Sequence, residues 1–236
     1  MASKRLLILT GWFAAALLAA GSAQAQFYVR ADGAYSKSDR VNFADVGPLG
    51  IICGNATCTS GGQFNDFGSG AAVGVGFGTR FSPDGRTDLT FTYRKYKLDQ
   101  SDQGNPPAKF KADLDSLAVM GNLYFEFTEG RGVAPYFGIG AGVAVNKLGD
   151  LSFDDGAGFQ GSVAGETKLN FAWGVMFGFG IPLGGRLVLD LAYRYMDLGD
   201  LQTIQNRDLT VGGTTVSYPG ATGHLHAHEL ALGFRF

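Results

Sequence analysis

Apolar and polar residues alternate with a period of two along most of the chain from residue 27 onward. In an extended strand every second side chain lies on the same face, so this pattern predicts strands with one apolar face. The opposite faces carry glycine, small polar residues and charged residues. The apolar rows of the eight predicted strands begin at Phe27, Ala71, Leu89, Leu117, Phe137, Phe171, Leu187 and Leu230.

The connections between these strands alternate between long and short. The short ones fall at about 82–85, 128–133 and 182–185, and the long ones at about 38–68, 99–110, 148–167 and 199–223. Alternating loop lengths and an apolar outer face are typical of a transmembrane β-barrel with an up-and-down topology. Lipid offers no hydrogen bonds, so the sheet must close by pairing its last strand with its first. The predicted fold class is therefore all-β, an eight-stranded antiparallel up-and-down transmembrane barrel.

The first 25 residues have the three parts of a secretory signal. Lys4 and Arg5 are followed by the apolar run 6–20, and the segment then ends in Ala23-Gln24-Ala25. We expect cleavage after Ala25, which leaves residues 26–236 as the barrel domain. A permanent membrane anchor is the alternative, but the run is short for a spanning helix.

Composition supports a membrane barrel and excludes some other classes. The chain has 37 glycines and 19 phenylalanines, and the glycines recur inside the alternating segments rather than in linkers. They are expected on the inner face, where they make room for tyrosine and arginine. The net charge of −2 predicts no nucleic-acid partner.

Ten charged residues of both signs fall on the predicted inner face. They are Arg30, Asp32, Arg80, Asp88, Arg94, Glu126, Asp190, Arg194, Glu229 and Arg235. Unpaired buried charges are costly, so we expect an ion-pair network. The expected pairs are Asp190 with Arg194, and Glu126 with a neighbouring arginine. The network is either a structural plug or a gate for small solutes; the narrow interior of an eight-stranded barrel favours the plug.

Two groups of residues are candidates for sites on the loops and the rim. Cys53 and Cys58 lie in the first long loop, and a disulfide is the expected state in an oxidising compartment. The three histidines His224, His226 and His228 share the outward face of the last strand. They are weak candidates for a metal site, because a catalytic zinc needs a third ligand and a pocket, and a convex outer face supplies no pocket; a solvated rim is favoured.

An enzymatic function is considered and not favoured. Some eight-stranded barrels modify lipid A, which requires a nucleophile or base held by a partner at the rim. Ser217 and the histidines, with Asp197 or Asp200 to orient them, are the residues near that rim, but no motif links them. No catalytic residue and no cofactor are predicted. The first long loop is unusually apolar, which suggests a surface that binds another protein or packs over the barrel mouth.

Four segments resemble small outer-membrane barrels of the opacity-protein and OmpA-like type. They are residues 116–127, 135–142 and 189–199, together with the final Gly233-Phe234-Arg235-Phe236. In this family the last residues act as an assembly signal, so the resemblance implies that role for Phe234 and Phe236. It implies a porin-like protein or surface antigen in the outer membrane of a Gram-negative bacterium.

The expected function is accordingly non-enzymatic: the barrel displays surface loops, as an antigen or adhesin does, and supports the envelope. A narrow porin for small solutes or ions is the first alternative, and a lipid A-modifying enzyme is the second. The expected partners are outer-membrane lipid and lipopolysaccharide, the outer-membrane assembly machinery, and a host or envelope protein that contacts the loops.

Overall fold

The computed structural model describes residues 26–39, 44–45, 68–101, 109–127, 132–154, 160–203, 207–211, 214–218 and 221–236. Three predictions concern residues outside these ranges and stay predictions: the signal segment 1–25, the Cys53–Cys58 disulfide and the apolar first loop. Within the described ranges, no helix is long and apolar enough to cross a membrane.

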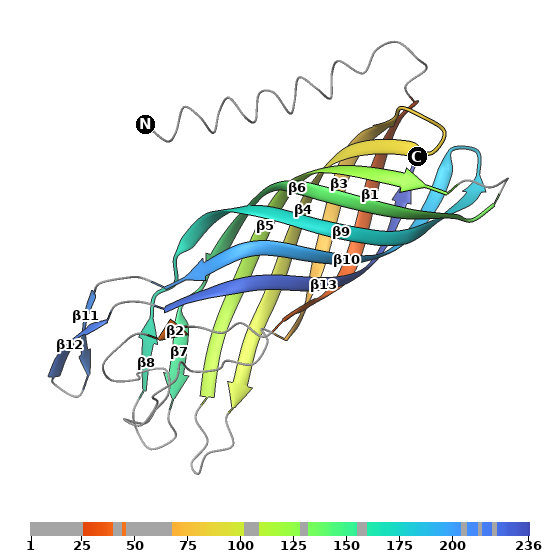
Figure 1. Ribbon diagram of the computed structural model, residues 1–236. Coiled ribbons are helices and arrows are strands. Elements are labelled where there is room, and N and C mark those ends of the chain that lie inside the picture. Colours follow the sequence, from red (N-terminus) through yellow and green to blue (C-terminus); the bar gives the residue numbers. More distant parts are fainter. Residues whose placement is uncertain are drawn as a thin grey trace, which may run out of the picture.

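Eight long antiparallel strands form a closed barrel (Figure 1). They are β1 (Gln26–Ser38), β3 (Ser69–Arg80), β4 (Gly85–Ser101), β5 (Lys109–Glu126), β6 (Ala134–Leu148), β9 (Thr167–Gly184), β10 (Leu187–Gln202) and β13 (Ala221–Arg235). Each strand pairs with the next one in the barrel, and β13 closes the barrel by pairing with β1, with Leu232 opposite Gly33. The predicted fold class is confirmed.

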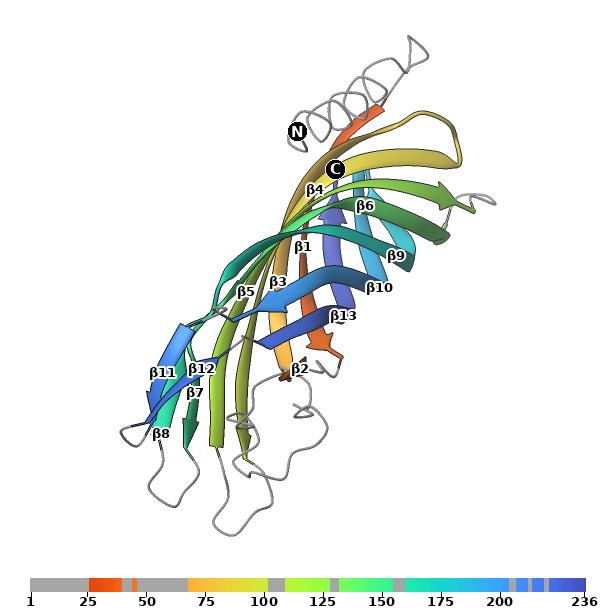
Figure 2. The same ribbon diagram turned by 60° about the vertical axis from the view of Figure 1, so that its left-hand side comes forward.

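The two ends of the barrel differ in how the strands are connected. At the turn end lie the first residue of β1, the last residue of β13 and the short connections. At the opposite end, which we call the loop end, lie five short strands (Figures 1 and 2). The short strands are β2 (Ala44–Asp45), β7 (Leu151–Asp154), β8 (Gln160–Val163), β11 (Arg207–Val211) and β12 (Thr214–Tyr218).

These short strands correct the predicted loop boundaries. The segment 148–167 contains the β7–β8 hairpin, which extends the sheet through pairing with β5, and the segment 199–223 contains the β11–β12 hairpin. In the segment 99–110, β4 continues to Ser101 and β5 begins at Lys109. Since β4 has 17 residues and β5 has 18, both exceed the roughly 9–11 residues that a tilted strand needs to cross a bilayer. Pairing therefore continues beyond the lipid.

One of the short turns lies further along the chain than predicted. Strand β9 runs through Pro182, which pairs with Val188, and ends at Gly184. The turn itself is made around Gly184 and Gly185, whose φ angles are +117° and +59°. Tight hairpins need positive φ angles that glycine adopts easily, so the glycine pair, rather than the proline, fixes the turn.

The outer and inner faces match the alternating pattern. On β13, Leu230 is 64% exposed and Leu232 is 50% exposed, whereas Ala231 is 6% exposed. Phe234 and Phe236 continue the exposed row to the turn end, and similar apolar rows cover the other barrel strands. A contiguous apolar outer surface of this kind is what a lipid-facing barrel requires.

Glycines on the inner face make room for tyrosine rings, as the sequence predicts. A Cβ atom at Gly178 would lie 2.6 Å from Cζ of Tyr136, and one at Gly138 would lie 2.5 Å from Cδ1 of Tyr124. The two tyrosine rings meet edge to face with centroids 5.7 Å apart. Larger residues at these glycine positions would displace the rings that fill the lumen.

Candidate functional site

The barrel interior contains a continuous chain of ten alternating charges, which we call the charge chain. In order of contact it runs Arg94, Glu229, Arg194, Asp32, Arg30, Asp88, Arg86, Glu126, Arg235 and Asp190. Its links span 2.6 Å to 3.7 Å. The five arginines balance the five carboxylates, so the chain has no net charge. It crosses the lumen repeatedly, because its members come from β1, β4, β5, β10 and β13.

The partners within the charge chain differ from one expected pair. Asp190 pairs with Nε of Arg235 at 3.4 Å, and Arg194 pairs with Asp32 at 2.8 Å. The sequence instead suggested that Asp190 and Arg194 bind each other along β10. Charged side chains on other strands come closer to Asp190 and Arg194 across the narrow lumen than these two come to each other, because they stand four residues apart on one strand. The parity of a residue, that is, whether its position along the strand is odd or even, assigns its side chain to one face of the sheet. It does not identify the residue with which that side chain pairs.

Glu126 is the carboxylate of the charge chain that contacts the most arginines. Its Oε1 accepts hydrogen bonds from Nε of Arg86 and from Nη1 of Arg235, each at 2.7 Å. Arg80 contacts the other oxygen of Glu126 from the turn end and is partly exposed. The expected pairing of Glu126 with a neighbouring arginine is therefore present with three arginines.

Arg86 is a buried residue that sequence reasoning missed. Its guanidinium carbon lies 3.6 Å from the ring centroid of Tyr124 and 4.9 Å from that of Tyr136. The predicted third strand began at Asp88, and residues 86 and 87, between the predicted turn at 82–85 and that strand, were assigned to neither. Arg86 stands two residues before Asp88, and this spacing of two was the signal that placed it on the inner face.

Between the charge chain and the loop end, the side chains that fill the barrel interior are mostly apolar. Its large members are Tyr96, Leu98, Leu114, Leu148, Leu151, Leu198, Leu201 and Leu225. Each of these side chains is at most 5% exposed. A cavity of about 20 Å³ lies beside the charge chain, lined by Arg30, Arg94 and Arg194 among others. That volume is enough for about one water molecule.

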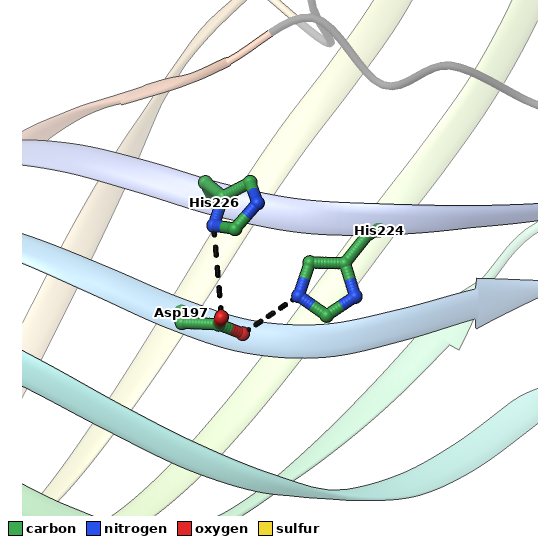
Figure 3. Close-up of side chains that lie close together, drawn as sticks. All are labelled: Asp197, His224 and His226. Carbon is green, nitrogen blue, oxygen red and sulfur yellow. Dashed lines mark hydrogen bonds and ion pairs between the residues drawn. The ribbon is translucent and has the colours of Figure 1, made fainter.

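A second candidate site lies on the outer surface at the loop end, on the paired strands β10 and β13. It consists of Asp197, His224 and His226, which we call the rim cluster (Figure 3). One potential ligand atom from each residue lies within 4.8 Å of the others. As predicted, the histidines point outward, whereas the carboxylate that joins them comes from the neighbouring strand.

A β-bulge in β10 brings Asp200 to the same outer face as the rim cluster. The pairing between β10 and β13 shifts between Asp197 and Gly199, so that Asp197 lies opposite His226 and Asp200 lies opposite His224. Without the extra residue, positions 197 and 200 would face opposite sides of the sheet. Gly199 adopts a φ angle of +79° at the bulge, and its backbone N–H donates to Asp197 Oδ1 at 3.0 Å.

The hydrogen bonds of the rim cluster hold both nitrogen atoms of His224. Nε2 lies 2.8 Å from Asp197 Oδ1, and Nδ1 lies 2.7 Å from Asp200 Oδ1. His224 stands on the loop side of the aromatic pair Tyr193 and Tyr195, beyond the lipid-facing row. Partial burial lowers the pKa of its imidazole, but the bonds to Asp200 and Asp197 more than offset this, and the pKa lies above its usual value.

His228 stands apart from the rim cluster, although the sequence groups it with the other two histidines. Its Nδ1 lies 2.6 Å from the Tyr193 hydroxyl, and its Nε2 lies 3.2 Å from Asp39. Ser217 belongs to β12 by its backbone, and its side chain lies outside the described part of the structure. The described residues thus bring an aspartate to two histidines, and the hydroxyl beside them is that of Tyr195, 3.0 Å from Nδ1 of His226.

The family model described as "Outer membrane protein beta-barrel domain" matches residues 6–236. The outer membrane protein PagN of Salmonella typhimurium is 27% identical over 146 residues, which cover 59% of this chain and 61% of PagN. An uncharacterized protein of Brucella abortus is 28% identical over 154 residues, 57% of this chain and 54% of that protein. The chain thus spans between about half and two thirds of these curated relatives.

A solved structure supports the fold. The outer membrane protein OprG of Pseudomonas aeruginosa superposes with a TM-score of 0.55 at 16% identity, covering 90% of this chain and 96% of OprG. This likeness concerns the fold alone. Because the family model covers nearly the whole chain, the protein belongs to the outer-membrane β-barrel family and resides in the outer membrane of a Gram-negative bacterium.

Proposed function

We propose that this protein is a non-enzymatic outer-membrane barrel with a closed interior, whose role is to support the envelope and to present its loops at the cell surface. The observation that carries the proposal is the filled lumen. The charge chain crosses it with balanced charge, and the apolar layer seals it towards the loop end. In family barrels the short turns face the periplasm, so the loop end faces outward.

The closed interior is tested by electrical recording across planar lipid bilayers. The protein, purified from outer membranes, is expected to give no steady single-channel conductance over a wide range of voltage. Opening a path for ions would require a buried charge pair to separate or a buried apolar side chain to move out of the lumen. Both events cost too much free energy to occur often in the folded barrel. Reproducible single-channel steps from pure protein would contradict the proposal and favour the narrow porin instead.

The narrow porin remains the second candidate because of one observation. The cavity of about 20 Å³ is lined by the arginines Arg30, Arg94 and Arg194, which would favour an anion. If the barrel conducts, this cavity predicts anion selectivity, which reversal potentials in a salt gradient would measure. A cation-selective channel would exclude the cavity as its narrowest point.

Presentation at the surface is tested on intact cells. External protease is expected to cut within the long connections at the loop end while the barrel strands remain protected, because closed strands expose no free backbone. Fragments cut in the short turns would instead place that end outside. The same digest, compared with and without reductant, tests the proposed Cys53–Cys58 disulfide: without reductant, the pieces on either side of a cut between the cysteines should stay joined.

The enzyme alternative has its own test. Lipid A from a strain that lacks the protein is expected to have the same acyl pattern as lipid A from the parent strain, measured by mass spectrometry. A changed pattern, restored by the intact gene but not by a variant with His224 replaced, would show that the rim performs chemistry on lipid.

A further inference from the structure

We propose that the rim cluster of Asp197, His224 and His226 binds one transition-metal ion of the zinc class at the outer surface. The three residues supply two imidazole nitrogens and one carboxylate oxygen, the donor set of many zinc sites with three protein ligands. They come from two paired strands of a rigid barrel rather than from a loop, so their spacing is fixed by the β10–β13 register (Figure 3).

The distances fit a single ion after small side-chain rotations. The potential ligand atoms lie within 4.8 Å of one another, with His224 Nε2 at 2.8 Å and His226 Nδ1 at 3.8 Å from the carboxylate oxygens of Asp197. Zinc bonds measure about 2.0–2.2 Å, so two ligand atoms of a tetrahedral ion lie about 3.3–3.6 Å apart. The widest pair must therefore approach by at most about 1.5 Å.

Each prospective ligand is also held by a second residue, as in established metal sites. Asp200 accepts from Nδ1 of His224 at 2.7 Å, and Lys168 contacts Asp200 at 3.3 Å. A carboxylate that binds the far nitrogen of a histidine orients the ring and increases its basicity towards a metal. Because Asp200 occupies Nδ1, the nitrogen that faces Asp197 is the one available to an ion.

The other two ligands have comparable support. The indole N–H of Trp173 donates to Asp197 Oδ2 at 3.1 Å, and the backbone N–H of Gly199 donates to Asp197 Oδ1. The His226 ring stacks on Tyr195, with centroids 5.8 Å apart and planes 18° apart. These contacts restrict the rotation of the carboxylate and the ring before an ion arrives, which lowers the entropy cost of binding.

The chemistry of the donors selects the type of ion. Calcium and magnesium prefer six or more oxygen ligands, which three side chains on an open surface do not supply. Imidazole nitrogen favours zinc, nickel and copper. The His224 side chain is 45% exposed, so an ion can reach the cluster from outside the cell, and the fourth position remains open to water or to another ligand.

The test is a calorimetric titration of zinc chloride into protein that carries no polyhistidine tag, purified from outer membranes and freed of metal. One zinc ion per chain is expected, with a dissociation constant below about 100 μM. Calcium and magnesium at the same concentrations are expected to give no binding heat. Absence of zinc binding by the unaltered protein, or equal binding of calcium, would overturn the proposal without any variant.

Variants then assign the ligands. His224→Asn and His226→Asn are expected to weaken zinc binding at least tenfold, and Asp200→Asn about tenfold through loss of the supporting hydrogen bond. The matched control is His228→Asn, on the same face of the same strand, which should change affinity less than twofold. Equal losses in all four variants would refute the assignment. Heat-modifiable migration in SDS gels verifies that each variant is folded.

A spectroscopic readout separates binding at the cluster from binding elsewhere. Trp173 contacts Asp197, so a nickel ion at the cluster lies close to its indole and should quench its fluorescence. We expect quenching that saturates at one ion per chain and is lost in His224→Asn. Quenching that persists unchanged in His224→Asn would place the ion outside the rim cluster and contradict the proposal.

Discussion

Replacing Glu126 with glutamine removes one charge from the middle of the charge chain while preserving the shape of the side chain. In the folded barrel the carboxylate receives Arg86 and Arg235, each at 2.7 Å, and contacts Arg80 as well. After the substitution, the charge chain has five arginines and four carboxylates, a net charge of +1. Breaking a buried ion pair by removing one partner destabilises proteins by about 3–5 kcal/mol.

The remaining contacts place the expected loss at the lower end of that range. Arg235 keeps Asp190 at 3.4 Å, Arg86 keeps Asp88 at 3.5 Å, and Arg80 keeps the carbonyl oxygen of Pro83 at 2.7 Å. We therefore expect Glu126→Gln to reduce the free energy of unfolding by about 3 kcal/mol.

The measurement is urea unfolding of the barrel in lipid vesicles, followed by tryptophan fluorescence and by heat-modifiable migration in SDS gels. The matched control is Asp115→Asn, on the same strand but in the exposed contact with Lys95 at 3.8 Å. An exposed pair contributes about 0–1 kcal/mol, so the control should be almost neutral. If the two variants lose the same small amount, water must screen the lumen, and the closed interior is wrong.

Three further substitutions test other parts of the structure. Leu191→Arg, in the middle of a lipid-facing row, should reduce the free energy of unfolding in vesicles by about 2–4 kcal/mol, whereas Leu187→Arg near the turn end should reduce it by about 0–1 kcal/mol. Equal losses would mean that the centre of the bilayer does not lie at Leu191. Gly178→Val should reduce the heat-modifiable fraction, because the added atoms meet the Tyr136 ring; an unchanged fraction would mean that the ring moves freely. Gly199→Ala, at a φ angle of +79°, should cost about 1–3 kcal/mol in urea unfolding, and a neutral result would contradict the bulge geometry.

The period-two pattern predicted the barrel because each strand has one face in lipid and one in the lumen. This rule placed every member of the closing apolar row, from Leu230 on β13 to Phe236 directly after it, and it predicted that the three histidines point outward. It also identified nine of the ten members of the charge chain. Parity is a local property of the strand, so it can be read without knowing the register between strands.

Three properties could not be predicted in the same way: the position of a side chain along the barrel axis, the register between strands, and the partner of each buried charge. The inner face changes from charged to apolar along β13, between Glu229 and Leu225, although parity treats the two positions alike. The pairing of Asp190 with Arg235 depends on the β10–β13 register, which places position 190 opposite Gly233. Nothing in the order of residues along β10 carries that information.

The bulge at Gly199 shows where a parity argument fails and what signal remains. After Leu198 the faces of β10 exchange, so a count from Tyr193 would place Asp200 inside the barrel, yet it reaches His224 on the outside. An isolated glycine in a strand often marks a bulge, and Gly199 was that mark. It was instead read as the start of a long loop, so Asp197 and Asp200 were named as residues that could orient the histidines, but their positions opposite His226 and His224 were not predicted.

The two candidate sites differ in what they allow an ion to do. Within the charge chain each arginine already contacts a carboxylate, so an ion that enters must separate partners at a cost of several kcal/mol. At the rim, Asp197 and His224 are partly exposed, and an ion can replace their hydrogen bond without moving the backbone. Under the two proposals made above, ions exchange with the surroundings at the rim cluster, and the charge chain contributes stability. Ion binding and ion conduction can therefore be tested independently in this protein.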